Sequence, residues 1–173
     1  MKTPFYIIWF FVLLFAGNLS AQNVLKVNPA GLLLNTGSAS FERFINDNWS
    51  AQADAMLHSA EVEGLQFSGF GVGLSLRYYL SERVRPGGLF VAPGAIFHFL
   101  SFEDIQRIDH DYSLPGLWLQ LGHQWVLGGV LTLELGVGGQ YGFLSEIPNS
   151  PSTDAYFGDG FFPFGNIGLG VTF

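Results

Sequence analysis

The chain has no cysteine and few charged residues, which make up 12% of its 173 positions, against about 25% in a typical soluble domain. The absence of thiols excludes a disulfide-stapled scaffold and a cysteine-ligated metal site. Seven basic residues face fourteen acidic ones, and the net charge of -7 argues against a nucleic-acid partner. Beyond the N-terminus there is no long apolar run, although 49% of the residues are hydrophobic and 16% are aromatic. That content is too high for a disordered chain.

The N-terminus has the pattern of an export signal. Lys2 supplies a positive charge, and the apolar run from Phe5 to Ala16 is too short to cross a bilayer comfortably. Ser20 and Ala21 are small residues that suit a cleavage site. We expect a signal peptide over residues 1–21 and an exported barrel domain over residues 22–173. An uncleaved N-terminal anchor is the alternative, and no cluster of charges follows to favour it.

The rest of the sequence alternates between apolar residues and small or polar ones. The clearest segment is residues 70–80, where large apolar residues alternate with Gly71, Gly73, Ser75 and Arg77. Glycine and serine are too small for the solvent face of a soluble sandwich, but they suit the inside of a narrow barrel. The apolar face would then meet lipid. A soluble lipocalin-like barrel is the alternative, and it would need polar outer positions that these strands lack.

We therefore predict an all-β fold, an eight-stranded antiparallel transmembrane β-barrel of the outer-membrane type with meander topology. Its strands are expected at residues 24–34, 38–45, 49–58, 66–80, 88–101, 113–127, 130–142 and 162–173. Short turns at 46–48, 81–87 and 128–129 would be periplasmic, together with both termini. The connections at 59–65, 103–111 and 143–161 would be extracellular, with a short one at 35–37. Pro29 is expected at a bulge or a strand edge.

The final strand ends on Phe173, preceded at alternate positions by Val171, Leu169 and Ile167. This pattern resembles the C-terminal strand of bacterial outer-membrane barrels, whose terminal aromatic residue is part of the signal read by the barrel assembly machinery. Further segments resemble a family of small outer-membrane barrels of unestablished function: KVNP (26–29), SASFER (38–43), NDNW (46–49), GVGLSLRYY (71–79) and LGHQW (121–125). The resemblance implies an architecture similar to that of the OmpA membrane domain and of OmpX, located in the bacterial outer membrane. It carries over no catalytic residues.

Charged residues also fall on the predicted inward face. Glu42, Arg77 and Glu134 share that face, and Asp54 is a further candidate. A buried arginine is stable only when it is paired, so we interpret the set as a salt-bridge plug that fixes strand register. A gate in which Arg77 exchanges carboxylate partners is the alternative. Eight strands leave an interior just wide enough for side chains, and four apolar residues are expected to help fill it: Phe90, Ile96, Trp118 and Phe164.

The remaining charges and aromatic residues sort by position along the strands. The aromatic residues near strand ends are expected to form belts at the membrane interface: Trp49, Tyr78, Tyr79, Trp125 and Tyr141. The basic residues expected towards the periplasmic side are Lys26, Arg43, Arg83 and Arg85. The predicted outer loops carry one base, Arg107, and these acids: Glu61, Glu63, Glu103, Asp104, Asp109, Asp111, Glu146, Asp154 and Asp159. The acids keep the loops hydrated, or hold divalent cations that bridge to anionic lipid headgroups.

Three functions are compatible with this pattern. The first is a structural or surface-interaction protein with a closed or narrow lumen. The second is a small gated channel. The third is a hydrolase that modifies lipid A, which would need a nucleophile, a base and an orienting acid close together. We favour the first. We expect the bilayer, lipopolysaccharide, the barrel assembly machinery and periplasmic chaperones as partners, a monomeric state, and no cofactor or nucleic acid.

The histidines are the candidates for such a hydrolase. His58 precedes Ser59, and His98 lies three residues before Ser101. The alternation turns both histidines into the lumen, whereas a lipid A deacylase would place them towards lipid. We therefore predict no catalytic residues.

Two further histidines are weaker candidates. His123 is expected outward at the periplasmic interface. His110 lies between Asp109 and Asp111, a triplet more consistent with a solvated loop than with a metal site. We therefore predict no bound metal.

Overall fold

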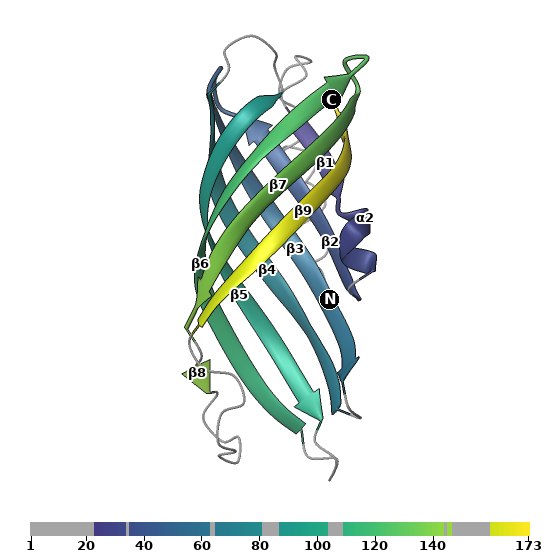
Figure 1. The fold of residues 1–173 in the computed structure, drawn as a ribbon, viewed down its shortest axis with the longest axis vertical. Helices are drawn as coiled ribbons and strands as arrows, with labels where there is room; N and C mark the ends of the chain where they lie inside the picture. Colours follow the sequence, from purple (N-terminus) through teal and green to yellow (C-terminus); the bar gives the residue numbers. More distant parts are fainter. Residues whose placement is uncertain are drawn as a thin grey trace, which may run out of the picture.

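The protein is an all-β, closed antiparallel barrel with meander strand order (Figure 1), as the alternation predicted. The computed structural model describes residues 23–33, 35–62, 65–80, 87–103, 109–143, 145–146 and 160–173. The wall consists of β1 (Asn23–Val27), β2 (Thr36–Phe44), β3 (Trp49–Val62), β4 (Leu65–Tyr79), β5 (Gly88–Glu103), β6 (Asp109–Leu127), β7 (Leu131–Gly142) and β9 (Gly160–Thr172). The two-residue strand β8 (Ser145–Glu146) pairs with β6, and the short helix α2 (Pro29–Leu32) follows β1.

The barrel closes where β1 meets β9. Val24–Val27 pair antiparallel with residues 169–172, and the backbones of Asn23 and Phe173 exchange hydrogen bonds of 3.1 and 3.0 Å. Asn23, Phe173 and the turns at 46–48 and 128–129 therefore lie at one end of the barrel, which we call the terminal end (Figure 1). The other end, where β3 and β5 finish, is called the loop end.

Two of the predicted short turns fall within the described residues. Asn46 Oδ1 accepts hydrogen bonds from the backbone amides of Asn48 and Trp49, both at 3.0 Å. Gly128 and Gly129 have φ values of +60° and +77°, the left-handed conformation of both central residues of a type I′ turn, and the Val130 amide donates to the Leu127 carbonyl at 3.3 Å. The predicted signal peptide (1–21) and most of the 81–87 turn lie outside the described residues, as do the loop acids Glu63, Asp104, Asp154 and Asp159. The other five acids expected in loops lie instead in strands, because β3, β5 and β6 extend beyond their predicted ends and β8 contains the last of them: Glu61, Glu103, Asp109, Asp111 and Glu146.

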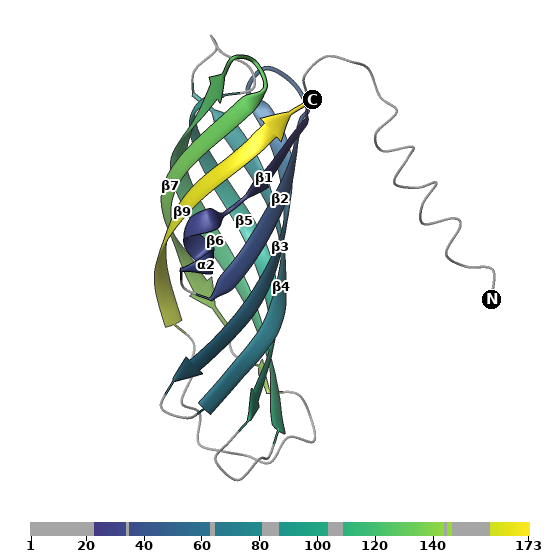
Figure 2. The same cartoon turned by 90° about the vertical axis from the view of Figure 1, so that its right-hand side faces the viewer.

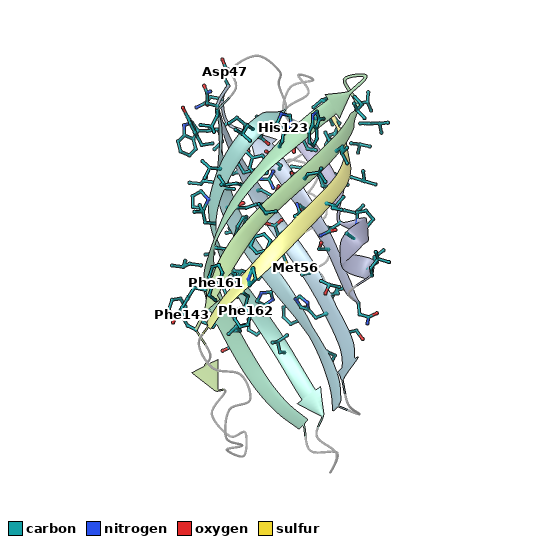
Figure 3. The ribbon with its side chains drawn as sticks, viewed as in Figure 1. Asp47, Met56, His123, Phe143, Phe161 and Phe162 are labelled. Atoms are coloured by element: carbon teal, nitrogen blue, oxygen red, sulfur yellow. The ribbon has the colours of Figure 1, made fainter. Side chains whose placement is uncertain are left out.

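Side-chain polarity is inverted relative to that of a soluble barrel. On β4, Leu74 is 68% exposed, whereas Ser75 and Arg77 are 5% and 0% exposed. On β6, Leu119 and Leu121 are exposed and Gln120 is buried. Alternate residues of a strand point to opposite faces, so the apolar set covers the outside and the polar set fills the lumen (Figure 3).

The first strand differs from its prediction. A single strand over 24–34 was expected, but β1 ends at Val27 and Pro29 begins α2. Proline lacks a backbone N–H and its fixed φ suits the first helical turn. Asn28 caps this turn, because its Oδ1 accepts a hydrogen bond from the Gly31 amide at 3.0 Å. Pro29 therefore lies at neither a bulge nor a strand edge. Within the described residues, no helix is long and apolar enough to cross a membrane.

The early end of β1 leaves the wall incomplete on one side. β9 pairs with β7 from Gly160 to Val171, but its other edge pairs with β1 only from Leu169 to Thr172. Among the described residues, no strand pairs with that edge of β9 over residues 160–168. α2 contacts both β2 and β9 and lies between them (Figure 2). We call this interruption of the strand pairing, bounded by α2, residues 36–38 of β2 and residues 160–168 of β9, the side gap.

Candidate functional site

Four charged side chains meet inside the terminal half of the barrel and form what we call the charge plug: Lys26, Glu42, Arg77 and Glu134. Each is at most 3% exposed. Arg77 makes a two-pronged ion pair with Glu134, with Nη1 at 2.6 Å and Nη2 at 3.1 Å from its two carboxylate oxygens. Lys26 Nζ bridges the carboxylates, at 2.8 Å from Glu42 and 2.7 Å from Glu134. Two cations balance two anions, which is the condition for burying charge at tolerable cost.

Neutral groups satisfy the remaining lone pairs of the plug. Ser50 and the Tyr79 hydroxyl both donate to Glu42 Oε1, the latter at 2.7 Å. Asn166 Nδ2 donates to Glu134 Oε1 at 2.7 Å. The Arg77 guanidinium lies 4.3 Å from the centre of the Phe90 ring, in cation–π geometry. The plug is therefore a connected polar network that ties six strands together.

Glycines on neighbouring strands make room for these large inward side chains. A Cβ at Gly170 would lie 2.7 Å from Lys26 Cγ, and one at Gly122 would lie 2.5 Å from Phe90 Cζ. Only a residue without a side chain allows these approaches. The glycines that the sequence places on the inward face thus leave the space that the large side chains of the plug occupy.

The structure brings together three of the four predicted network residues and adds one. Glu42, Arg77 and Glu134 meet, whereas Asp54 bonds through Oδ1 to Gln52 Nε2 at 2.7 Å and lines a separate cavity. Lys26, expected towards the periplasmic side, lies at the centre of the plug. The sequence held a signal for it, since Lys26 alternates with the apolar Leu25 and Val27, and two inward carboxylates leave a single arginine one charge short.

Tyr79 also differs from its prediction as an interface residue. It is 1% exposed and its ring packs between Phe44 and Phe90, with ring centres 5.1 and 5.6 Å away. With Val24 and Ala92 these rings form a buried apolar cluster. In the alternating pattern of residues 70–80, Tyr78 falls on the outward face and Tyr79 on the inward face. The sequence pattern therefore places Tyr79 inside the barrel.

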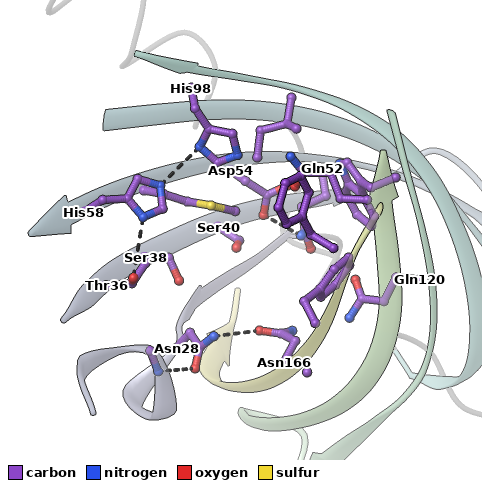
Figure 4. A pocket seen from close by; sticks show the side chains of 18 residues that line it. Asn28, Thr36, Ser38, Ser40, Gln52, Asp54, His58, His98, Gln120 and Asn166 are labelled. Carbon is purple, nitrogen blue, oxygen red and sulfur yellow. Dashed lines mark hydrogen bonds between the residues drawn. The ribbon is translucent and has the colours of Figure 1, made fainter. Parts of the chain in front are cut away.

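Beyond the plug, towards the loop end, lies a cavity of about 270 Å³ that we call the lumen pocket (Figure 4). Its apolar wall includes Met56, Ile96, Trp118 and Phe164, of which Trp118 and Phe164 contact edge to face at 6.0 Å. Its polar wall includes Ser38, Ser40, Gln52, Asp54 and Gln120. The lining also includes residues on both borders of the side gap: Gly31 and Thr36 on one, and Phe162 and Gly165 on the other.

The two histidines that alternation turned inward meet in this pocket. His58 Nε2 lies 3.1 Å from His98 Nδ1, and Thr36 Oγ1 lies 3.5 Å from His58 Nδ1. Gly71 lies between them, where a Cβ would be 2.6 Å from His98 Nδ1. Ser59 is exposed. The described partners of His58 are therefore another histidine and a threonine, not the adjacent serine that the hydrolase alternative would require.

The outward-facing candidates lie at the surface. Trp49, Trp125 and Tyr141 are 39–45% exposed, and Trp49 packs on Tyr78 with ring centres 4.9 Å apart. His123 is half-buried against Trp125, with ring centres 4.2 Å apart. The C-terminal positions are 40–46% exposed: Ile167, Leu169, Val171 and Phe173.

Candidate metal ligands are sparse. Among the described residues, no group of three or more His, Asp or Glu side chains is arranged to hold a metal ion. The side chains of Asp109, His110 and Asp111 lie outside the part that the structure describes.

One comparison with known families gives a result. Residues 6–148 match the family described as a protein of unknown function, DUF3575. No curated protein and no solved structure matches the chain.

Proposed function

Since the chain belongs to the DUF3575 family over most of its length, whose description leaves the function open, we propose a function from its own geometry. The protein is an integral outer-membrane β-barrel with a surface-interaction role, and its lumen is closed by the charge plug. The observation that carries this proposal is the inverted polarity of the wall, with leucines 52–68% exposed at Leu74, Leu117, Leu119 and Leu121 over a buried ionic interior. A soluble protein rarely exposes so large a continuous apolar surface.

Aromatic residues support the same assignment at both edges of this surface. Trp49, Tyr78 and Trp125 lie near the terminal end. Tyr141, Phe143 and Phe161 lie towards the loop end (Figure 3). From Leu133, which pairs with Trp125, to Tyr141 there are eight residue steps, or about 27 Å of strand. At a tilt of ~40° this is roughly 20 Å along the barrel axis, close to the apolar height of an outer-membrane barrel.

The charge plug favours a surface-binding role over the diffusion of solutes through the lumen. Eight strands enclose only enough room for side chains, and here the terminal half holds a neutral set of paired charges beside the buried rings of Phe44, Tyr79 and Phe90. The predicted extracellular connections, rich in acids, are the proposed contact surface for lipopolysaccharide or surface partners. The outward C-terminal residues are the proposed recognition segment for the barrel assembly machinery. The histidine pair has no carboxylate among its described partners, so we propose no catalytic role.

Membrane fractionation followed by electrophoresis with and without boiling tests this proposal. A folded barrel is expected in the outer-membrane fraction and should change mobility on boiling. A protein that stays in the soluble periplasmic fraction, with unchanged mobility, would overturn the membrane assignment.

A further inference from the structure

The lumen pocket has an apolar body and an acidic floor. Among the described residues that line it, Asp54 is the one acid, and none is Lys or Arg. Asp54 Oδ2 and Gln52 Oε1 are both buried and have no hydrogen-bond partner among the described residues. Both atoms are acceptors, and a buried acceptor without a donor is costly. The floor therefore fits a ligand group that donates hydrogen bonds and carries positive charge.

The size of the pocket limits how much of a ligand it can hold. Its volume of about 270 Å³ corresponds to roughly nine water molecules at ~30 Å³ each. A head group and a few methylene groups fit beside Met56, Ile96 and Trp118. A longer chain must leave the pocket.

The side gap provides the exit. Phe162 and Gly165 on β9 and Gly31 and Thr36 on the opposite border all line the pocket, so the cavity reaches the wall where the strand ladder is interrupted. Leu32 and Leu33 next to the gap are 66% and 86% exposed, which places apolar surface at its outer rim. A side-chain hydrogen bond of 3.0 Å from Asn28 to Asn166 spans the gap (Figure 4).

We propose that the lumen pocket binds the amine head of a single-chain amphiphile, and that the alkyl chain runs out through the side gap into the bilayer. The amine donates to Asp54 Oδ2 and Gln52 Oε1, and the first methylene groups lie along Trp118 and Phe164. This inference rests on the proposed membrane location, because only there does the gap open onto hydrocarbon.

The test uses native mass spectrometry of the full chain, released from neutral detergent after heat-modifiable mobility has shown that the barrel is folded. The probes are octylamine, dodecylamine, hexadecylamine and dodecanoate, each at the same concentration. We expect one adduct with all three amines at similar occupancy, and much less with dodecanoate. If octylamine binds and hexadecylamine does not, the pocket is enclosed and the side gap is not an exit. Preferential binding of dodecanoate would overturn the assignment of the head group.

Two variants separate the site from adventitious adducts. Asp54→Asn keeps the side-chain volume and should lower dodecylamine occupancy about tenfold, the effect of losing one charged hydrogen bond. Ser38→Phe fills the pocket from β2 beside the gap and should abolish binding. Its control, Ala39→Phe, adds the same ring on the exposed outer face and should leave binding intact. Equal adduct formation by all variants would overturn the proposal. Failure to reach the membrane fraction would instead overturn the proposed function.

Discussion

Asn166 joins the charge plug to the side gap. Its Nδ2 donates to Glu134 at 2.7 Å, and its Oδ1 accepts from Asn28 Nδ2 at 3.0 Å. Asn28 in turn caps α2 through Gly31. One amide therefore couples the ion-pair network, the unpaired edge of β9 and the helix that lies beside it. The hydrogen bond between Asn28 and Asn166 spans the gap between the α2 segment and residues 160–168.

The two roles of Asn28 can be separated by substitution. Asn28→Asp keeps an oxygen for the Gly31 amide but loses the donor to Asn166, whereas Asn28→Ala loses both. We expect Asn28→Asp to raise hydrogen exchange at Gly31–Leu33 modestly. Asn28→Ala should raise it further, by the ~1 kcal/mol that an N-cap contributes. Exchange in β4 and β5 serves as the internal control. Equal exchange in both variants and the wild type would contradict a role for Asn28 in holding α2.

The stability of the plug depends on its charge balance. Lys26→Met leaves Glu42 and Glu134 with one cation, and breaking a buried pair in this way costs about 3–5 kcal/mol. The double variant Lys26→Met, Glu42→Gln restores neutrality and should recover much of that loss. The measurement is urea unfolding of the barrel in lipid vesicles, followed by the mobility of unboiled samples. If the double variant is no more stable than the single one, charge balance is not what the plug requires.

The same network makes a prediction about conduction. With the plug intact we expect no stepwise conductance when the protein is inserted in a planar bilayer. Lys26→Ala with Glu42→Ala removes one cation and one anion, keeps neutrality, and opens space beside Arg77. This variant should admit water and small ions. Wild-type conductance that persists with stable steps would favour the gated-channel alternative over a closed barrel.

Strand alternation predicted most of the barrel because one rule, period two, governs both the fold and the polarity of its faces. It also placed His58 and His98 inward. It did not predict that they touch, since their contact depends on the register of β3, β4 and β5 and on the space left by Gly71. Both depend on how separate strands pair, which the sequence of a single strand does not determine.

The side gap could not be predicted from the sequence, for a related reason. Pro29 is compatible with a bulge, a strand edge or a helix start, and local sequence does not choose between them. Pro29 begins a helix here because Asn28 caps that helix and because α2 packs against β2 and β9. The position of Lys26, in contrast, could have been predicted, because its alternation with the apolar Leu25 and Val27 and the count of inward charges both pointed to the lumen.

Inward glycines should differ in their tolerance of a methyl group. A Cβ at Gly170 would lie 2.7 Å from both Lys26 Cγ and Thr132 Oγ1 and even closer to the Leu25 carbonyl oxygen, whereas one at Gly73 would meet only ordinary contacts at 3.5 Å or more. Gly170→Ala should therefore destabilise the barrel by about 1–3 kcal/mol through overpacking, and it should loosen the seam between β1 and β9. Gly73→Ala, the matched control, should unfold at nearly the wild-type urea concentration. Similar losses at both positions would mean that close packing at the seam is not the cause.

The assignment of the outer surface to lipid can be tested by placing a charge on it. Leu74 is 68% exposed, and on β4 it lies between the outward aromatic residues Phe70 and Tyr78, near the middle of the apolar band. Leu127 is 55% exposed but adjoins the turn at Gly128. In a bilayer, Leu74→Arg should cost about 2–4 kcal/mol and Leu127→Arg only ~0–1 kcal/mol, because the cost of arginine on an outer-membrane barrel falls with distance from the midplane. In a soluble protein neither arginine would be penalised, since both would face water. Urea unfolding of the two variants in phosphatidylcholine vesicles therefore separates the two environments, and equal stabilities would argue against a lipid-facing wall.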